Sequence, residues 1–220
     1  MSSITNFELT NKDIKTLKEK KINPYKNIDY SKLVVRKPWG YEYLIYQSKD
    51  VAVWILYIKK NQLTSMHAHP QKKTALIVLD GEVICRSFNK TSKKKTGDAV
   101  IIDRKVFHQT SNDSNKDSII MEIETPNNKG DLVRLVDRYG RANQGYEKAD
   151  KFDVNLSNYN YMTLKSRDVL YNFTKKYGNT SIIFKRIHNK NELQKIIENN
   201  QKSLISILEG KIELDKKEYN

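Results

Sequence analysis

Three of the four histidines in this 220-residue chain lie in two short segments. His67 and His69 are two positions apart, and His108 follows later in the chain. Residues two apart on a β-strand point to the same side, so His67 and His69 can face one interior while His108 arrives from another strand. Imidazoles are common ligands of transition metals. The spacing therefore predicts that the three rings converge on one metal ion, and hydrogen-bonded core histidines are the alternative.

The segments around the histidines have the pattern of short β-strands separated by turns. The run from Val51 to Ile58 is almost wholly apolar and predicts a buried strand. Asp80-Gly81 is a strong hairpin signal between two apolar runs. Strands are expected over residues 51–58, 75–79, 83–88, 99–102 and 118–123. Short strands at this near-regular spacing predict an all-β sandwich or barrel.

The histidine segments also carry two longer motifs. They are Asn61-x5-His67-x-His69-x11-Gly81 and Gly97-Asp98-x9-His108-x3-Asn112. Together they resemble the two-part signature of the cupin superfamily, and this resemblance implies a jelly-roll barrel that often holds a metal. With the entrance block Arg36–Gly40 and the exit block Gly130–Arg141, residues 33 to 145 look most like the cupin domain of type II phosphomannose isomerases, which also accompanies mannose-1-phosphate guanylyltransferase.

The resemblance fails at one ligand position. In metal-binding cupins a glutamate commonly lies seven residues before the motif glycine, where this chain has Thr74. A hydroxyl is a poor ligand for a divalent ion, so the expected site is built from His67, His69 and His108. A later carboxylate, or water and substrate oxygens, can fill the open positions. The expected cofactor is a divalent ion, with zinc, iron, manganese and nickel all left open.

Glu122 and Glu124 are the candidate catalytic carboxylates. The resemblance implies an enzyme similar to mannose-6-phosphate isomerase, and aldose–ketose isomerisation needs a base near the carbon acid and an electrophile on the oxygen. A bound ion can supply the electrophile. Both glutamates share one face of their predicted strand, with Met121 and Ile123 on the other. A solvated outer face is the alternative for both.

Candidate substrate contacts come from the exit block and from the segment after the histidines. The guanidinium groups of Arg134 and Arg141 suit phosphate oxygens, and the resemblance places both near a sugar phosphate, with Tyr139 beside them. A surface pair of Asp137 with Arg138 is the alternative interpretation of this block. Lys73 is a further candidate contact, although a solvated Lys72–Lys73 pair is the alternative in so lysine-rich a chain.

Composition limits the partners. The net charge is +14, but the lysines are scattered among acidic residues and no nucleic-acid-binding motif is present, so we expect no nucleic-acid partner. The tight basic run at residues 93–95 is expected to be a solvated hairpin loop. A single cysteine, Cys85, excludes an intramolecular disulfide framework. We find neither a secretory signal nor an apolar run long enough for a membrane span, and we expect a cytoplasmic protein.

Three regions are expected in the chain. Residues 1–32 form an N-terminal arm with a helix over 11–21 that Pro24 ends, and residues 33–149 form the barrel. Residues 150–220 form a mixed α/β tail, with a strand at 181–187, a helix at 191–199 and a hairpin at 204–214 that echoes residues 76–84. The tail is either a partial second cupin-like unit or a hairpin that completes a sheet of this barrel or of a partner. Similar cupins pair through their sheets, so a homodimer is expected.

Three functions remain open from the sequence. The first is a metal-dependent sugar-phosphate isomerase, or a related enzyme acting on a phosphorylated or nucleotide-linked sugar, that serves surface-polysaccharide precursor synthesis. The second is a three-histidine iron oxygenase, which a neutral ligand set suits. The third is a non-catalytic sugar-binding cupin, which Thr74 favours.

Overall fold

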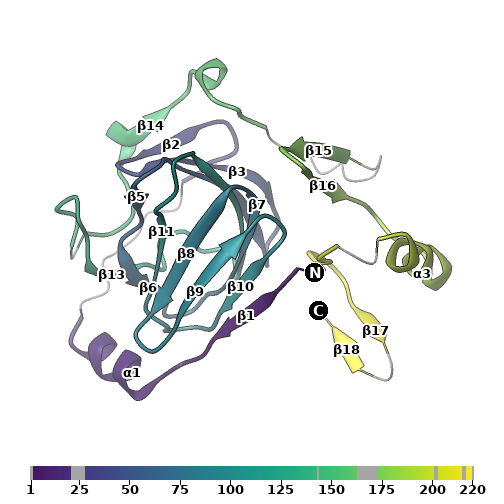
Figure 1. Cartoon of the computed structure of the whole chain (residues 1–220), viewed down its shortest axis with the longest axis horizontal. Helices are drawn as coiled ribbons and strands as arrows, with labels where there is room; N and C mark the ends of the chain where they lie inside the picture. Colours follow the sequence, from purple (N-terminus) through teal and green to yellow (C-terminus); the bar gives the residue numbers. More distant parts are fainter. Residues whose placement is uncertain are drawn as a thin grey trace.

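Two β-sheets face each other and form a barrel (Figure 1). The computed structural model describes residues 2–20, 28–142, 144–162, 173–200, 203–214 and 217–219. The eight-stranded sheet contains, in order, β1 (Ile4–Phe7), β10 (Ala99–Ile102), β7 (Lys73–Asp80), β12 (Ser118–Thr125), β4 (Ala52–Ile58), β3 (Gly40–Gln47), β2 (Val34–Lys37) and β14 (Phe152–Asp153). The six-stranded sheet contains β13 (Val133–Val136), β6 (Met66–Ala68), β11 (His108–Asn112), β8 (Glu82–Ser87) and β9 (Thr91–Lys95), with β5 (Gln62–Leu63) also paired to β11. The fold is therefore the predicted all-β jelly roll.

Alternation along the central strands separates two apolar layers. Trp54 and Leu56 of β4 belong to the cluster inside the barrel. Val53 and Ile55 belong to a second cluster on the outer face of the eight-stranded sheet. Successive residues of a strand point to opposite faces, so a strand covered on both sides becomes a continuous apolar run. This double burial explains the apolar segment that the sequence shows at residues 51–58.

The C-terminal segment covers the outer face of the eight-stranded sheet. The hairpin of β15 (Phe173–Tyr177) and β16 (Thr180–Phe184) lies beside the barrel (Figure 1). It buries Tyr177, Ile182 and Phe184 in the outer cluster. The hydroxyl of Tyr43 donates to the carbonyl oxygen of Asn160 at 2.7 Å. The tail thus supplies the apolar layer that the outer face of the sheet needs.

The expected elements of the tail are only partly present. Helix α3 (Lys190–Asn199) begins after the capping residue Asn189, close to the predicted start. The hairpin predicted at residues 204–214 is wrong, because residues 203–208 form no strand. Leu208 packs on the outer cluster as part of an irregular segment. The strands β17 (Ile212–Leu214) and β18 (Lys217–Tyr219) pair only with each other.

The N-terminal arm is attached to the barrel at two points. Strand β1 pairs in parallel with β10, and helix α1 (Asn11–Lys18) follows it. Asp13 completes a capping box with Thr10 and also accepts a hydrogen bond from the backbone N–H of Phe107 at 2.8 Å. The helix ends before the predicted boundary, and residue 21 and Pro24 lie outside the described residues. No helix in the described part of the chain has the length and hydropathy of a membrane span.

The basic run at residues 93–95 is not the solvated loop that the sequence predicts. It forms the edge strand β9, paired with β8. Alternation turns Lys94 inward, where its ammonium group donates to the hydroxyl of Ser3 at 2.9 Å. Lys93 stays exposed and pairs with Glu82 at 3.0 Å. Lysines on an edge strand also discourage pairing with a further chain.

We expect Gly40→Ala to destabilise the barrel strongly. Gly40 has a φ of +146°, and a Cβ atom there would lie 1.9 Å from the carbonyl oxygen of Tyr57. Strain and overlap together should cost about 3 kcal/mol or more in the free energy of unfolding, measured by chemical denaturation. Gly140→Ala is the control, because Gly140 has a φ of +78° but nothing within 4 Å of the added atom. Equal losses in the two variants would contradict the prediction.

Candidate metal centre and pocket

The structure brings the three predicted histidine ligands together. His67 on β6 lies directly opposite His108 at the start of β11, and His69 follows the end of β6. The ring centroids are 4.3 to 5.3 Å apart. One ring nitrogen of each residue lies within 4.8 Å of the others. His69 and His108 are buried, whereas His67 is partly exposed.

Hydrogen bonds determine which ring nitrogen of each histidine is free. In all three residues Nδ1 lies within hydrogen-bond distance of a backbone carbonyl oxygen. For His67, His69 and His108 these oxygens belong to Ser65 (2.8 Å), Asp131 (2.6 Å) and Val106 (3.0 Å). A carbonyl oxygen can only accept, so Nδ1 carries the proton and Nε2 keeps its lone pair. Burial lowers the pKa of all three rings, to about 4 for His108, and so keeps them neutral.

These histidines fit a divalent transition metal. Nε2 of His69 is buried and has no hydrogen-bond partner. A neutral imidazole whose Nδ1–H is held by a carbonyl is the usual arrangement of a metal-ligating histidine. The cavity beside the rings measures about 60 Å³, which is room for an ion and a few water-sized atoms.

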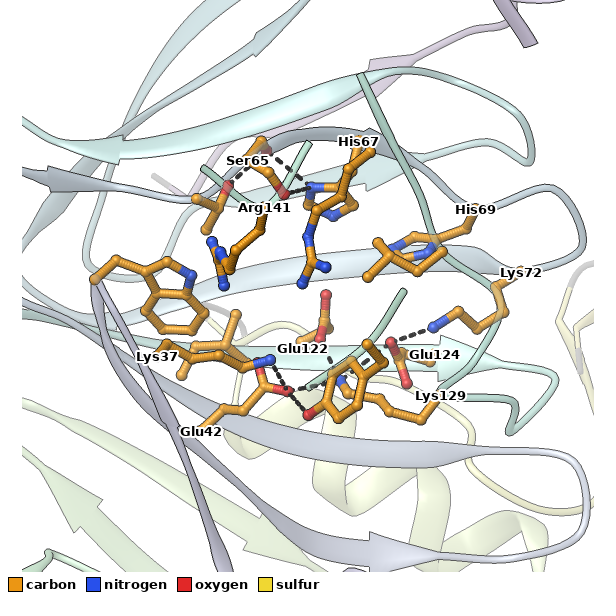
Figure 2. A pocket seen from close by; sticks show the side chains of 16 residues that line it. Lys37, Glu42, Ser65, His67, His69, Lys72, Glu122, Glu124, Lys129 and Arg141 are labelled. Atoms are coloured by element: carbon orange, nitrogen blue, oxygen red, sulfur yellow. Dashed lines mark hydrogen bonds and ion pairs between the residues drawn. The ribbon is translucent and has the colours of Figure 1, made fainter. Parts of the chain in front are cut away.

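Two carboxylates face the histidines from the opposite sheet. Figure 2 shows His67 and His69 on one wall and the Glu122 and Glu124 side chains, from β12, on the other. Both glutamates are buried and point inward, on the side of β12 away from Ile123. Ligand atoms of His69, Glu122 and Glu124 form a second group within 4.8 Å. Nitrogen ligands on one sheet therefore meet oxygen ligands on the other.

Two buried lysines hold these carboxylates. The ammonium group of Lys72 lies 2.6 Å from Glu124, and that of Lys129 lies 3.4 Å from both Glu122 and Glu124. The interpretation of Lys72 as solvated is therefore wrong. Its backbone N–H is held by the carboxylate of Asp131 at 2.8 Å, where its side chain enters the pocket.

Lys73, the predicted substrate contact, does not line the pocket. Its side chain is half exposed and pairs with Asp103 at 3.1 Å. Lys72 and Lys73 are neighbours at the start of β7, so alternation sends one side chain into the barrel and the other to solvent. The sequence prediction selected the outer of the two.

The two glutamates have opposite pKa shifts. Burial raises the pKa of Glu122 to about 7, since the attraction of Lys129 only partly offsets burial and the neighbouring Glu124 adds repulsion. Burial also acts on Glu124, but Lys129 and Lys72 outweigh it and lower its pKa. Paired carboxylates whose pKa values are pushed apart are typical of acid–base sites. Glu122 can gain or lose a proton near neutral pH while Glu124 stays charged.

The exit-block arginines line the same pocket and are already paired. Arg134 donates to Glu147 at 3.0 Å and to the carbonyl oxygen of Gln144 at 3.0 Å. Arg141 contacts Glu147 at 2.5 Å and Asp137 at 2.7 Å, so Asp137 pairs with Arg141 and not with Arg138. The Nε–H of Arg134 is buried without a partner and remains free for an acceptor.

Tyr139 lies outside the pocket. Its hydroxyl donates to the side-chain oxygen of Gln62 at 2.7 Å, so Tyr139 ties the exit block to β5. Four further side chains that the sequence patterns did not single out line the cavity: the charged Lys37, Glu42 and Lys129, and the neutral Tyr146. Lys129 and Lys37 hold the pKa of Glu42 at about 2 against the effect of burial. The sequence of β3 does carry a signal for Glu42, because this glutamate interrupts the apolar residues of a buried strand and so indicates a buried charged group.

Comparison with known proteins gives one family match and several structures of low similarity. Residues 54–124 match the family model described as Cupin domain. This segment contains all three histidines and both Glu122 and Glu124. The barrel has a cupin fold. No curated protein matches the chain.

The solved structures similar to this cupin barrel are distant. An uncharacterized conserved protein with a double-stranded beta-helix domain from Klebsiella pneumoniae is 20% identical, with a TM-score of 0.40 over 44% of this chain and 84% of that chain. A sugar phosphate isomerase of the cupin superfamily from Silicibacter pomeroyi is 14% identical, with a TM-score of 0.33 over 34% of this chain and 50% of that chain. An oxalate decarboxylase from Lactobacillus farciminis is 18% identical, with a TM-score of 0.43 over 46% of this chain and 33% of that chain. None of these similarities is close enough to bear on function.

A buried carboxylate of the cupin barrel lies beside Thr74, the position where the cupin pattern has a glutamate. Thr74 on β7 lies directly opposite Glu124 on β12. The Thr74 hydroxyl and one oxygen of Glu124 are both buried without a hydrogen-bond partner. The neighbouring strand therefore brings a carboxylate to the place where the cupin pattern leads us to expect one. Nothing in the local sequence of β7 indicates this exchange, because it depends on the register between two strands.

Proposed function

We propose that this protein is a metal-dependent enzyme that moves a proton beside a carbonyl group of a phosphorylated or nucleotide-linked sugar, as a sugar-phosphate isomerase does. One observation carries the proposal. Three imidazoles with free Nε2 atoms lie close together, and two of them, His67 and His69, line a cavity opposite a glutamate whose pKa is about 7. The similarity of the entrance and exit blocks to phosphomannose isomerases supports the sugar phosphate as substrate and surface-polysaccharide precursors as the destination.

His67, His69 and His108 would hold the ion, with Glu124 as an oxygen ligand. When bound, a divalent ion would supply a Lewis acid for the carbonyl oxygen of the substrate. The backbone carbonyls of Ser65, Asp131 and Val106 keep the three rings oriented. Removing such outer partners typically weakens a metal site, so the orientation is part of the site.

Glu122 is the residue we assign to proton transfer. In its carboxylate form it takes the proton from the carbon next to the carbonyl, and it then returns that proton to the neighbouring carbon. The proton of the neighbouring hydroxyl passes to the former carbonyl oxygen as well, so the aldose becomes a ketose through an enediol and the protein ends unchanged. Lys129, 3.4 Å away, holds the Glu122 carboxylate in the cavity. A base with a pKa close to the working pH is the most efficient proton carrier.

The pocket also favours an anionic group on the substrate. Five cationic and three acidic side chains line the cavity. Glu147 pairs with Arg134 and Arg141 and so neutralises part of this excess positive charge. The free Nε–H of Arg134 provides a donor for a phosphate oxygen, and guanidinium groups suit phosphate geometry.

Metal reconstitution followed by proton exchange tests the proposed function. The purified chain is loaded separately with zinc, iron(II), manganese or nickel and incubated in D₂O with mannose 6-phosphate and related sugar phosphates. We expect loss of the C2 proton signal in the NMR spectrum with at least one ion. Oxygen consumption without exchange would instead identify an iron oxygenase. Ligand binding with neither reaction would identify a non-catalytic cupin.

We expect Lys72→Met to weaken the metal-free fold and to strengthen metal binding. The variant leaves Glu124 buried without its closest cation, and breaking a buried pair in this way costs about 3–5 kcal/mol. It also removes a positive charge that acts on all three histidines, so the dissociation constant for Zn²⁺ should fall by about tenfold or more. Chemical denaturation and calorimetric titration measure the two effects.

Lys73→Met is the matched control for Lys72→Met. Lys73 is the adjacent lysine, and its side chain points to solvent. Neither stability nor zinc affinity should change appreciably in this variant. If Lys72→Met weakened zinc binding, the ammonium group would be part of the ligand environment and not its competitor.

A further inference from the structure

A second cavity lies beside the metal pocket and is much larger. It measures about 540 Å³, whereas the cavity at the histidines measures about 60 Å³. Ligand-binding pockets typically span roughly 300–1,000 Å³. Lys129 lines both cavities and forms the wall between them. The smaller cavity accommodates an ion and a reacting group, and the larger one has the size of a whole ligand.

One buried donor in the second cavity has no partner. Trp54 lines this cavity and not the metal pocket, and it is only 1% exposed. Its indole N–H makes no hydrogen bond. A buried donor without a partner costs about 1–3 kcal/mol, and a ligand oxygen that reaches this N–H would remove that cost. The rest of the indole is already in contact, with Lys129 3.8 Å from the ring centroid and Tyr30 edge-on at 5.3 Å.

Three amide side chains also line the cavity. They come from the end of β3 and from the loop after β12, and they are Gln47, Asn127 and Asn128; Ile28, Asp29 and Tyr30 complete the lining. The amide NH₂ of Asn127 donates to the side-chain oxygen of Gln47 at 3.3 Å and to the carbonyl oxygen of Ser48 at 3.1 Å. Within the described residues, the Asn127 oxygen, the Gln47 NH₂ and the Asn128 amide keep free hydrogen-bonding capacity.

This lining selects against an anion. The ammonium group of Lys129 is already shared among three carboxylates at 3.3 to 3.4 Å. Asp29 adds a negative charge at the rim. Free amide oxygens accept hydrogen bonds, and the indole and amide N–H groups donate them. Sugar hydroxyls both donate and accept, so a neutral sugar ring offers partners to both kinds of group.

We propose that the second cavity binds a neutral sugar ring. The statement that this ring is the uncharged part of the substrate rests on the function proposed above, but the binding of the ring itself does not. A substrate made of a reactive sugar and a further sugar unit would then place its reacting end at the histidines and its neutral ring against Trp54.

The two tryptophans of the chain provide a separate probe for each cavity. Trp39 lines the metal pocket and Trp54 lines the second cavity, and the chain has no other tryptophan. In Trp39→Phe, the remaining fluorescence reports on the second cavity alone. Metal-free Trp39→Phe is titrated with methyl mannoside, methyl glucoside, methyl galactoside and neutral disaccharides, to about 50 mM, the range of weak sugar affinities. We expect a saturable change with at least one of these sugars, and none in Trp54→Phe.

Asn127→Ala and its control locate the binding. In the Trp39→Phe background, Asn127→Ala should weaken sugar binding by about fivefold or more, because it removes hydrogen bonds to the ligand. Asn115→Ala removes an exposed asparagine remote from the cavity and should leave affinity unchanged. Inorganic phosphate should not displace the sugar. If Trp39→Phe does not fold, saturation-transfer NMR of the same sugars with the unaltered chain replaces the fluorescence readout, with Asn127→Ala and Asn115→Ala as before.

Several results would overturn the proposal. They are the absence of saturable binding of any neutral sugar, equal weakening by both asparagine variants, and displacement of the sugar by phosphate. Because the protein is metal-free, failure of the metal centre cannot produce these results. Sugar binding without proton exchange would overturn the proposed isomerase and leave this second site in place. Proton exchange on a sugar phosphate without any change in Trp54 fluorescence on adding neutral sugars would overturn the second site and leave the proposed isomerase in place.

Discussion

Replacing His69 by alanine is expected to reduce bound metal from about one equivalent to less than about a tenth, since the variant loses a ligand of the centre. His69 is the only residue that belongs to both ligand groups found in the described part of the chain. Its Nε2 is buried without a partner, so a bound ion is the natural recipient of that lone pair. Elemental analysis of the protein after reconstitution and desalting measures the effect.

The matched control for His69→Ala is His188→Ala. His188 is exposed in the C-terminal segment. The His188→Ala variant should therefore keep a full equivalent of metal. His69→Ala should also retain the circular dichroism spectrum of the barrel, because the ring contributes little to either apolar cluster. A full equivalent of metal in folded His69→Ala would remove this residue from the centre and contradict the proposed ligand set.

The variant Glu122→Gln is expected to lower the rate of C2 proton exchange by about 10²- to 10⁴-fold, the usual contribution of a positioned general base. Glutamine has nearly the same shape as glutamate but cannot accept the proton from carbon. Metal content should stay close to one equivalent, because the three histidines remain. The comparison separates proton transfer from metal binding, and NMR in D₂O measures the rate.

The pH dependence provides a second measurement on the same residue. Burial raises the pKa of Glu122 to about 7, so the base form increases as the pH rises through that value. The exchange rate of the unaltered protein should therefore rise with pH and level off above about 7, and this step should be absent in Glu122→Gln.

Two further variants test the assignment of Glu122. Glu82→Gln is the control on the outside of the barrel, where Glu82 is partly exposed and pairs with Lys93. It should leave rate and pH profile unchanged. If Glu122→Gln kept its rate while Glu124→Gln lost it, Glu124 would be the base and the assignment of the two carboxylates would be reversed.

Much of the barrel follows from local patterns in the chain. Asp80-Gly81 predicts the turn between β7 and β8, where Gly81 has a φ of +86°. The predicted strand at residues 99–102 coincides with β10. In β12 the alternation of Glu122 and Glu124 with Met121 and Ile123 places the two glutamates on one face, as the structure shows. These features depend on turn chemistry and on the two-residue period of a strand, which are interactions between near neighbours.

Other predictions failed because burial is not encoded locally. Lys94 belongs to a polar run that resembles a solvated loop, yet strand pairing with β8 turns it inward. Lys72 and Lys73 are identical in type and adjacent in sequence, and only the position of β7 in the closed barrel places one inside and the other outside. The first half of the hairpin predicted at residues 204–214 has a suitable apolar pattern, but residues 203–208 form no strand.

The sequence by itself determined that three imidazoles lie in segments able to meet inside a β-barrel and that two glutamates share one strand face. Only the tertiary structure decided which charges oppose them. Lys72, just before β7, meets Glu124 of the neighbouring strand β12, Lys37 meets Glu147, and Lys129 is shared among three carboxylates. Most of these partners lie far apart in the chain, and the pairing of strands that are distant in sequence brings them together. The pKa of Glu122 is a property of that closed, buried arrangement and not of the residues around it in sequence.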